Sequence, residues 1–252
     1  MPPQQNTRND FDLPVFRPRV DELNKRDMLR KSWWKILSIV LLSVTVVAGF
    51  MGGVPAKPIL NETIRNLYFH VAMWFCMMIF FTISLVYSIK YLRSNKLIHD
   101  WYALAFTQSG ILFGVLGLLT GMIWAGYTWG KAWSNDPKQI GAAIALLIYF
   151  AYLVLRNSLN DDVRKAKTGA VYNVFAYAML FPTIWIIPRM VESLHPGGMG
   201  NPALDTHDID SRMRMIFWPA AIPGWTLLGL WITTMRIRLK ILEEQKLNTP
   251  TR

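Results

Sequence analysis

Three tryptophans fall within ten residues in the run from Trp124 to Gln139, which reads W-A-G-Y-T-W-G-K-A-W-S-N-D-P-K-Q. An interfacial aromatic belt accounts for scattered tryptophans near a membrane surface. Trp124, Trp129 and Trp133, with Gly130 inside the run, instead predict a flat apolar shelf at that surface. Indole faces of this kind stack favourably on large planar ligands.

Four histidines complete the set of residues that could do chemistry. His70 lies about one turn into an apolar block, where an ionisable side chain is a functional candidate by default, although a hydrogen bond to a neighbouring helix would also explain it. His195 precedes P-G-G on a tight turn, where a histidine can equally be solvated. His207 stands among acidic residues and His99 in a short polar connection, so both rank lower. Neutral imidazole is a common axial ligand of haem iron.

A porphyrin suits both features, because it is a flat apolar disc that carries two anionic propionates. Propionates pair well with lysine and arginine. Basic side chains stand in or beside the same stretches: Lys131, Lys138, Arg189, Arg212 and Arg214. Two imidazoles over an aromatic shelf therefore predict a surface-exposed, bis-histidine site for haem b. A disc held by loops suits a site that must release its haem.

Composition excludes several other classes of protein. The chain has 252 residues, of which 52% are hydrophobic, in apolar blocks separated by short charged strings, so we expect a polytopic membrane protein in the lipid bilayer. The basic residues behind its net charge of +11 lie in those charged strings and do not gather on one soluble face, which argues against nucleic-acid binding. The single cysteine, Cys76, excludes an internal disulfide and a C-x-x-C-H haem attachment site. No P-loop motif is present, so ATP hydrolysis of that kind by this chain is not expected.

Six apolar blocks, each near the ~20 residues of a spanning helix, predict an all-α membrane protein with a six-transmembrane-helix bundle. They cover about 33–53, 67–89, 102–124, 140–156, 169–188 and 216–235. Gly110, Gly114, Gly117 and Gly121 give the third block a small-residue face for close packing. Asn135 or Asp136 is expected to cap the fourth helix, with Pro137 at its first position.

The distribution of lysine and arginine predicts the orientation. With both termini cytoplasmic, 20 of the 27 basic residues lie on the inner side, as the positive-inside rule requires. We therefore expect a polar cytoplasmic N-terminal tail at 1–32, a transmembrane domain at 33–242 and a cytoplasmic C-terminal tail at 243–252. The tryptophan-rich loop at 124–139, His70 and His195 then share the outer face.

The segment W-G-K-A-W-S-N-D-P-K resembles the tryptophan-rich "WWD" segment of the haem-handling proteins of cytochrome c maturation. The six-helix plan, F-H-V around His70 and L-H around His195 are similar to the haem exporter protein C family. The resemblance covers the chain from about Trp33 to Leu242. The family pattern usually has tryptophan where this chain has Asn135, and often another at Ala132.

The resemblance implies that the segment holds haem on the periplasmic face of the bacterial inner membrane, with His70 and His195 as the axial ligands. Gly130 and Asp136 match the family pattern, and Asp136 would order the loop or meet a partner. The resemblance further implies that haem is bound transiently and presented to a membrane-anchored haem chaperone. Release would be driven by an associated ATP-binding-cassette complex, together with other maturation subunits.

The interpretation is thus a haem-binding and transfer module, not an enzyme. Two alternatives stay open. A b-type membrane cytochrome that carries electrons would require a second histidine pair at helical depth. A cofactor-free structural subunit of a membrane complex would use the aromatic loop only as a protein interface.

Overall fold

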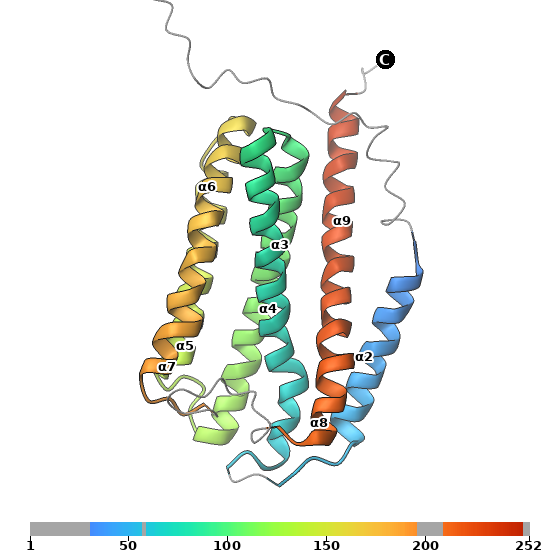
Figure 1. The fold of residues 1–252 in the computed structure, drawn as a ribbon, viewed down its shortest axis with the longest axis vertical. Coiled ribbons are helices and arrows are strands. Elements are labelled where there is room, and N and C mark those ends of the chain that lie inside the picture. Colours follow the sequence, from blue (N-terminus) through green and yellow to red (C-terminus); the bar gives the residue numbers. More distant parts are fainter. Residues whose placement is uncertain (1–30, 57–58, 196–208, 249–252) are drawn as a thin grey trace, which may run out of the picture.

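The computed structural model describes residues 31–56, 59–195 and 209–248, which are mostly helical. Six segments within these ranges are long and apolar enough to cross a membrane, which confirms the predicted all-helical architecture with six spans. The spans lie side by side along the long axis of the molecule (Figure 1). His207 and most of the tail expected at 1–32 lie outside the described residues, and residues 243–248 continue the last helix.

Three of the six spans combine an α-helix with tighter or wider turns. In chain order the elements are α2 (Trp33–Met51), a 3₁₀ turn η2 (Asn61–Asn66), a π-helical turn η3 (Leu67–Val71), α3 (Ala72–Ser94), α4 (Leu97–Trp129), α5 (Pro137–Asn157), α6 (Asp162–Leu180), a π-helical turn η4 (Phe181–Ile186), α7 (Ile187–Met190), α8 (Ser211–Ile216), a π-helical turn η5 (Phe217–Ala221) and α9 (Ile222–Asn248).

Five of the six spans are longer than the apolar blocks that predict them. α4 has 33 residues, so at ~1.5 Å per residue it is about 50 Å long and extends beyond a hydrocarbon core of ~30 Å. Hydropathy reports the part of a helix that lies in lipid. It says little about the polar turns that continue the helix into the interface.

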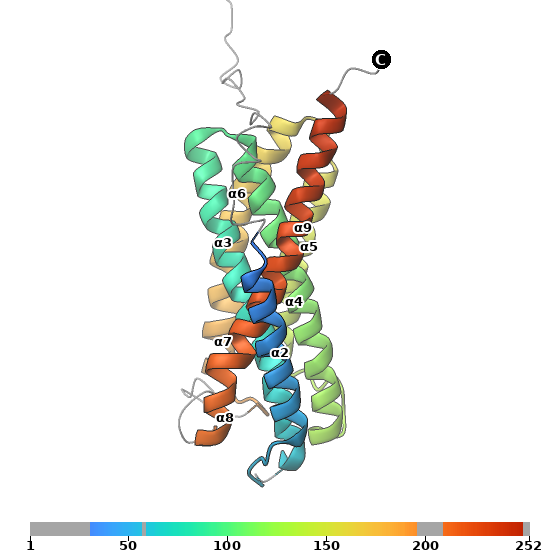
Figure 2. The same cartoon turned by 90° about the vertical axis from the view of Figure 1, so that its right-hand side faces the viewer.

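α3 packs mainly on α4 and α6, and α2 packs on α9 at the edge of the bundle (Figures 1 and 2). The short α3–α4 and α5–α6 connections lie at one end of the molecule. The described connecting residues 52–56, 59–60, 130–136, 191–195 and 209–210 lie at the opposite end, because successive spans alternate in direction. The tryptophan-rich loop and the start of the second span therefore share one end.

The small-residue face of α4 packs closely against α3, as its spacing predicts. A Cβ atom added to Gly110 would lie 2.5 Å from the Phe81 ring, and one added to Gly121 would lie 2.5 Å from the imidazole of His70. These glycines let aromatic side chains of the second span lie directly on the α4 backbone. The close approach of α3 and α4 depends on them.

A buried ion pair joins α4 to α5 at the end where the short connections lie. Arg156 donates two hydrogen bonds to Asp100, with Nη1–Oδ1 and Nη2–Oδ2 distances of 2.6 and 2.7 Å. Nη1 also donates to the Lys165 carbonyl at 3.2 Å. Both side chains are less than a tenth exposed. Breaking such a pair leaves one charge buried without compensation, which costs roughly 3–5 kcal/mol.

We therefore expect Arg156→Met to lower the free energy of unfolding by about 3–5 kcal/mol, because Asp100 loses its partner. Thermal unfolding of the detergent-solubilised protein measures the effect. Arg93→Met, at an exposed position on the last turn of α3, is the matched control and should change stability little. The pair does not have the structural role assigned to it if Arg156→Met is as stable as the control.

Candidate functional site

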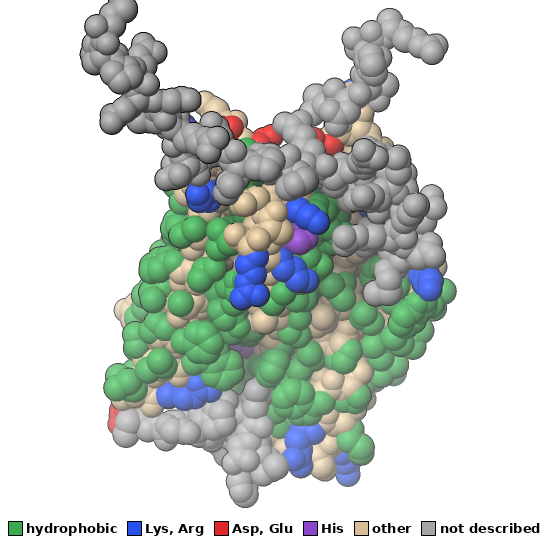
Figure 3. Space-filling view, turned by 45° about the horizontal axis from the view of Figure 1, so that its top comes forward, with side chains coloured by type: hydrophobic (Ala, Val, Ile, Leu, Met, Phe, Trp, Pro, Cys, Tyr) green, Lys and Arg blue, Asp and Glu red, His purple; other side chains and the backbone are tan. Residues whose placement is uncertain are grey.

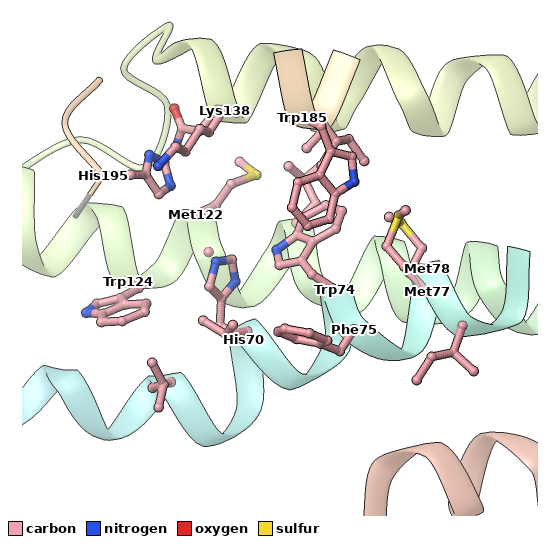
Figure 4. Close-up of a pocket in the computed structure, with 18 of the residues that line it drawn as sticks. His70, Trp74, Phe75, Met77, Met78, Met122, Trp124, Lys138, Trp185 and His195 are labelled. Carbon is pink, nitrogen blue, oxygen red and sulfur yellow. The ribbon is translucent and has the colours of Figure 1, made fainter. Parts of the chain in front are cut away.

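A cavity of about 590 Å³ lies at the end of the bundle that carries the tryptophan-rich loop. Its walls come from η2, η3 and α3, from α4, from the first turns of α5 and from η4 and α7. Small-molecule sites typically have this size. His70 and His195, which are far apart in the sequence, both line the cavity and face each other across it (Figure 4). The fold thus brings the two leading histidine candidates into one space.

His70 is held against the backbone of α4. Its Nδ1 lies 2.9 Å from the carbonyl oxygen of Gly117, and the residue as a whole is only 9% exposed. A carbonyl can only accept, so Nδ1 must be the protonated nitrogen. Nε2 then carries the lone pair, which is the form of imidazole that binds a metal.

The space for His70 depends on Gly121, since an added Cβ would overlap the imidazole. We expect Gly121→Ala to displace the ring and to lower ligand affinity by about tenfold or more, as disturbed ligand orientation does at other metal sites. Gly126→Ala is the matched control on the same helix, because the nearest atom to its added Cβ is 3.9 Å away. Imidazole nitrogens bind haem iron well, so titration with haem measures the ligand affinity of both variants. Equal affinities for the two variants would contradict the packing role of Gly121.

His70 stands in one of the three π-helical turns that the described part of the chain contains, all near this end of the bundle. η4, the second of these turns, carries another cavity residue, Trp185. Such turns occur frequently at functional sites. Pro182 and Pro219 lie within η4 and η5, where the missing N–H disfavours a regular α-helix. η3 has no proline, so no residue in it predicts the turn that positions His70.

His195 is oriented by Asp136, which directly precedes α5. The distance from His195 Nδ1 to Asp136 Oδ1 is 2.8 Å, and the carboxylate side chain is fully buried. A carboxylate accepts, so Nδ1 of His195 donates and Nε2 again keeps the lone pair. Carboxylate–histidine pairs of this geometry fix the tautomer and the ring orientation of metal ligands.

Asp136 also organises the loops around His195. Its Oδ1 accepts from the Lys138 N–H at 2.9 Å, so Asp136 is the N-cap of α5 and Pro137 is the first residue of that helix. Asp136 is one of the two caps that the sequence predicts. Its Oδ2 accepts from Ser193 Oγ at 2.8 Å and from the Leu194 N–H at 2.7 Å. One buried carboxylate therefore connects the tryptophan-rich loop to the loop that carries His195.

The charge of Asp136 follows from these contacts. Burial alone would raise the pKa of the carboxyl, but the hydrogen bonds from His195, Ser193 and Leu194 hold its pKa well below the usual range. A carboxyl whose pKa falls on folding stabilises the folded state above its ordinary pKa, and the effect is lost only as the pH falls through the lowered value. Asp136 is therefore a carboxylate at neutral pH.

The three tryptophans of the run occupy different environments. Trp124 lines the cavity with its ring edge-on to His70 at 5.7 Å between centroids, and its Nε1 donates to Thr63 Oγ1 at 2.9 Å. Trp129 packs edge-on against His195 at 4.8 Å. Trp133 is 38% exposed and does not line the cavity. Trp124 and Trp129 thus each pack on one of the two imidazoles, but only Trp124 lines the cavity, and no single shelf is shared by all three.

Gly130 ends α4 and starts this loop. Its φ of 74° is in the left-handed region, which glycine adopts at helix C-termini without steric cost. Asn135 has a φ of 56°, and its Oδ1 accepts from Trp133 Nε1 at 2.7 Å. Asparagine tolerates this backbone better than most residues. The residue present at 135 therefore has a conformational role in this chain.

A family model described as "Heme exporter protein C" matches residues 22–251 of the chain. The chain belongs to this haem exporter protein C family. A curated relative, "Heme exporter protein C" of Haemophilus influenzae, is 26% identical over 219 residues, which cover 82% of this chain and 83% of the relative. The family resemblance seen in the sequence is confirmed.

Other relatives carry the name "Cytochrome c biogenesis protein CcsA". The protein from Pelargonium hortorum is 37% identical over 90 residues, which cover 35% of this chain and 28% of the relative. The protein from Prochlorococcus marinus is 37% identical over 98 residues, with 37% and 31% covered. The match thus spans less than a third of either relative. Together with the haem exporter protein C match, these relatives indicate a multi-pass membrane protein with a role in cytochrome c maturation.

Two further tryptophans line the cavity of this haem exporter protein C family member, and neither was predicted from the sequence. Trp74 lies edge-on to His70 at 6.1 Å and packs on Gly117. Trp185 faces the same space from η4 (Figure 4). Trp74 follows His70 by four residues, so helical spacing would have placed it on the same face. No comparable local signal marks Trp185.

Of the five basic residues expected to meet an anionic ligand, Lys138 and Arg189 line the cavity. Arg189 lies over the ring of Trp185 at 4.6 Å and donates to the Trp185 carbonyl at 2.7 Å. Lys131, Arg212 and Arg214 do not line it, and His99 lies at the opposite end beside Ser94 and Tyr87.

The lining therefore combines two oriented imidazoles, apolar aromatic walls and two cations. These are the groups that would bind an iron porphyrin: nitrogen ligands for the iron, apolar surface for the ring and positive charge for the propionates. The site residues present in this family member fit haem on chemical grounds.

Proposed function

We propose that this chain binds haem as cargo in the cavity between His70 and His195, on the periplasmic side of a bacterial inner membrane. It then passes the haem to a membrane-anchored haem chaperone during cytochrome c maturation. One observation carries the proposal: the two imidazoles line one cavity, and each has its Nδ1 engaged as a hydrogen-bond donor. Both Nε2 atoms are thereby left as iron ligands.

Different residues of the chain would bind different parts of the haem. His70 and His195 would bind the iron axially, Trp124 and Trp74 would pack around the ring, and the cavity cations would pair with the propionates. No residue has to break or form a covalent bond in this role, so we propose a binding and transfer protein without turnover chemistry. An associated ATP-binding-cassette complex would drive release, because the bonds from both imidazoles to the iron would have to be given up.

The position of His195 supports release. His70 is buried within a span, whereas the His195 side chain is 24% exposed and belongs to a loop. Loops open at lower free energy than packed helices. The His195 side is therefore the side from which haem would leave first.

Two measurements on the detergent-purified full chain test the proposal. Added haem should give a Soret band that saturates at one haem per chain. Addition of the haem chaperone should then move that band to the chaperone. A protein without a Soret band would be a cofactor-free structural subunit. A protein that keeps its haem in the presence of the chaperone, and exchanges electrons with quinol, would be a b-type cytochrome. Either result contradicts the proposal.

A further inference from the structure

A second cavity, of about 400 Å³, lies at the end of the bundle opposite His70 and His195. It is bounded by the first turns of α4, by the α5–α6 connection and by the last turns of α9. Lys and Arg side chains gather at this end, above a flank of hydrophobic side chains (Figure 3). The haem proposal assigns no role to this cavity.

The cavity contains a closed ion pair that is not available to a ligand. Arg156 and Asp100 satisfy each other through two hydrogen bonds, and the guanidinium also donates to the Lys165 carbonyl. Gly169 lets the guanidinium lie directly on the α6 backbone. This pair forms a rigid and electrically neutral wall.

Charged side chains of both signs line the rest of the cavity. Lys240 and Glu244 pair with each other at 2.9 Å. Lys165 and Asp162 on α6, and Arg236 and Glu243 on α9, form no ion pair with any residue in the described ranges. Arg236 donates one hydrogen bond to Gln108, which leaves further N–H donors on its guanidinium. Two cations and two carboxylates remain for a ligand, so the cavity suits a ligand that itself carries both signs.

The remaining lining is apolar and reaches the outer surface of the helices. Trp101 and Leu104 on α4 and Leu239 on α9 line the cavity, and Leu239 is 59% exposed. Leu239 lies just beyond the apolar block at 216–235, where α9 leaves the hydrocarbon core, so its exposed side chain borders the lipid interface. A ligand of this cavity would therefore place charged groups inside and an apolar part along the lipid-facing surface.

We propose that this cavity binds the headgroup of a zwitterionic phospholipid of the bilayer, with its phosphate on Arg236 and Lys165 and its ammonium group on Asp162 and Glu243. Basic pockets between spanning helices bind lipid headgroups in other membrane proteins. The acyl chains would lie along Trp101 and Leu239. A primary ammonium donates hydrogen bonds to carboxylates and a choline group does not, so phosphatidylethanolamine is the expected lipid.

Native mass spectrometry of the full chain tests the proposal, with phosphatidylethanolamine, phosphatidylcholine and phosphatidylglycerol added in separate samples. We expect phosphatidylethanolamine to be retained most. The double variant Lys165→Gln/Arg236→Gln should reduce its retention about tenfold, because it removes two charge-assisted contacts. The double variant Arg164→Gln/Arg93→Gln removes the same charge from positions that do not line the cavity, and should leave retention unchanged.

The Soret titration of both double variants controls for folding, since neither touches the haem cavity. Glycerophosphoethanolamine, the same headgroup without acyl chains, should bind far more weakly than the lipid. Equal retention of the three lipids would overturn the proposal. So would equal binding of the chain-free headgroup, or equal loss in the two double variants.

Discussion

His70→Ala and His195→Ala are each expected to abolish the assembly of c-type cytochromes in cells that have no other copy of this protein. Each change removes one of two proposed axial ligands, whereas insertion of the six spans depends on their apolar length. Immunoblotting of membranes should show normal levels of both variants, while haem staining shows no mature cytochrome c. Wild-type amounts of cytochrome c in either variant would contradict the ligand assignment.

The other histidines provide matched controls for this experiment. His99→Ala changes an imidazole that lies at the far end of the bundle, and should leave assembly intact. His207→Ala should also do little. If His207 proves essential while His195 is dispensable, the loop ligand has been chosen wrongly, although the cavity and His70 would keep their role.

Asp136→Ala is expected to be the most damaging change outside the ligand pair. It removes the acceptor for His195 Nδ1, for two donors of the His195 loop and for the first N–H of α5. We expect haem affinity to fall about 10- to 100-fold, as for other residues that orient metal ligands. Stability should also fall by roughly 1–3 kcal/mol, because buried donors lose their partner.

Asp161→Ala separates the two roles of Asp136. Asp161 caps α6 in the same manner, by accepting from the Arg164 N–H at 2.7 Å, but it lies at the end of the bundle opposite His70 and His195. This control should lose about 1 kcal/mol of stability and keep its haem affinity. If Asp136→Ala lowers stability no further than Asp161→Ala and binds haem normally, the carboxylate is only a helix cap.

The spans of this protein were predictable from sequence because lipid requires long apolar helices. The six blocks, the glycine face of α4 and the cap before Pro137 all appear in the structure. Helix ends were not predictable from hydropathy, because the polar turns outside the hydrocarbon core have no apolar signature. The π-helical turn at His70 was not predictable either, since it contains no proline and follows from packing against α4.

The candidate site was likewise predictable only in part from the sequence. Residue chemistry and local context pointed to His70, His195 and Trp124, which the structure brings to one cavity, whereas Trp129 and Trp133 of the same prediction do not line it. The role of Asp136 as the orienter of His195 required knowledge of which loops meet, because 59 residues separate the two. The convergence of Trp185 on the cavity likewise depends on how η4 packs beside α5. Such long-range contacts leave no periodic pattern in a single sequence.

The spectrum of the ferric haem complex tests the central claim most directly. With two imidazole ligands the iron should be six-coordinate and low-spin, as seen by optical absorption and electron paramagnetic resonance. His70→Ala and His195→Ala should each convert it to a high-spin form, and free imidazole should restore the low-spin spectrum. A low-spin spectrum that is the same in the wild type and in either variant would show that the iron is not held between these two side chains.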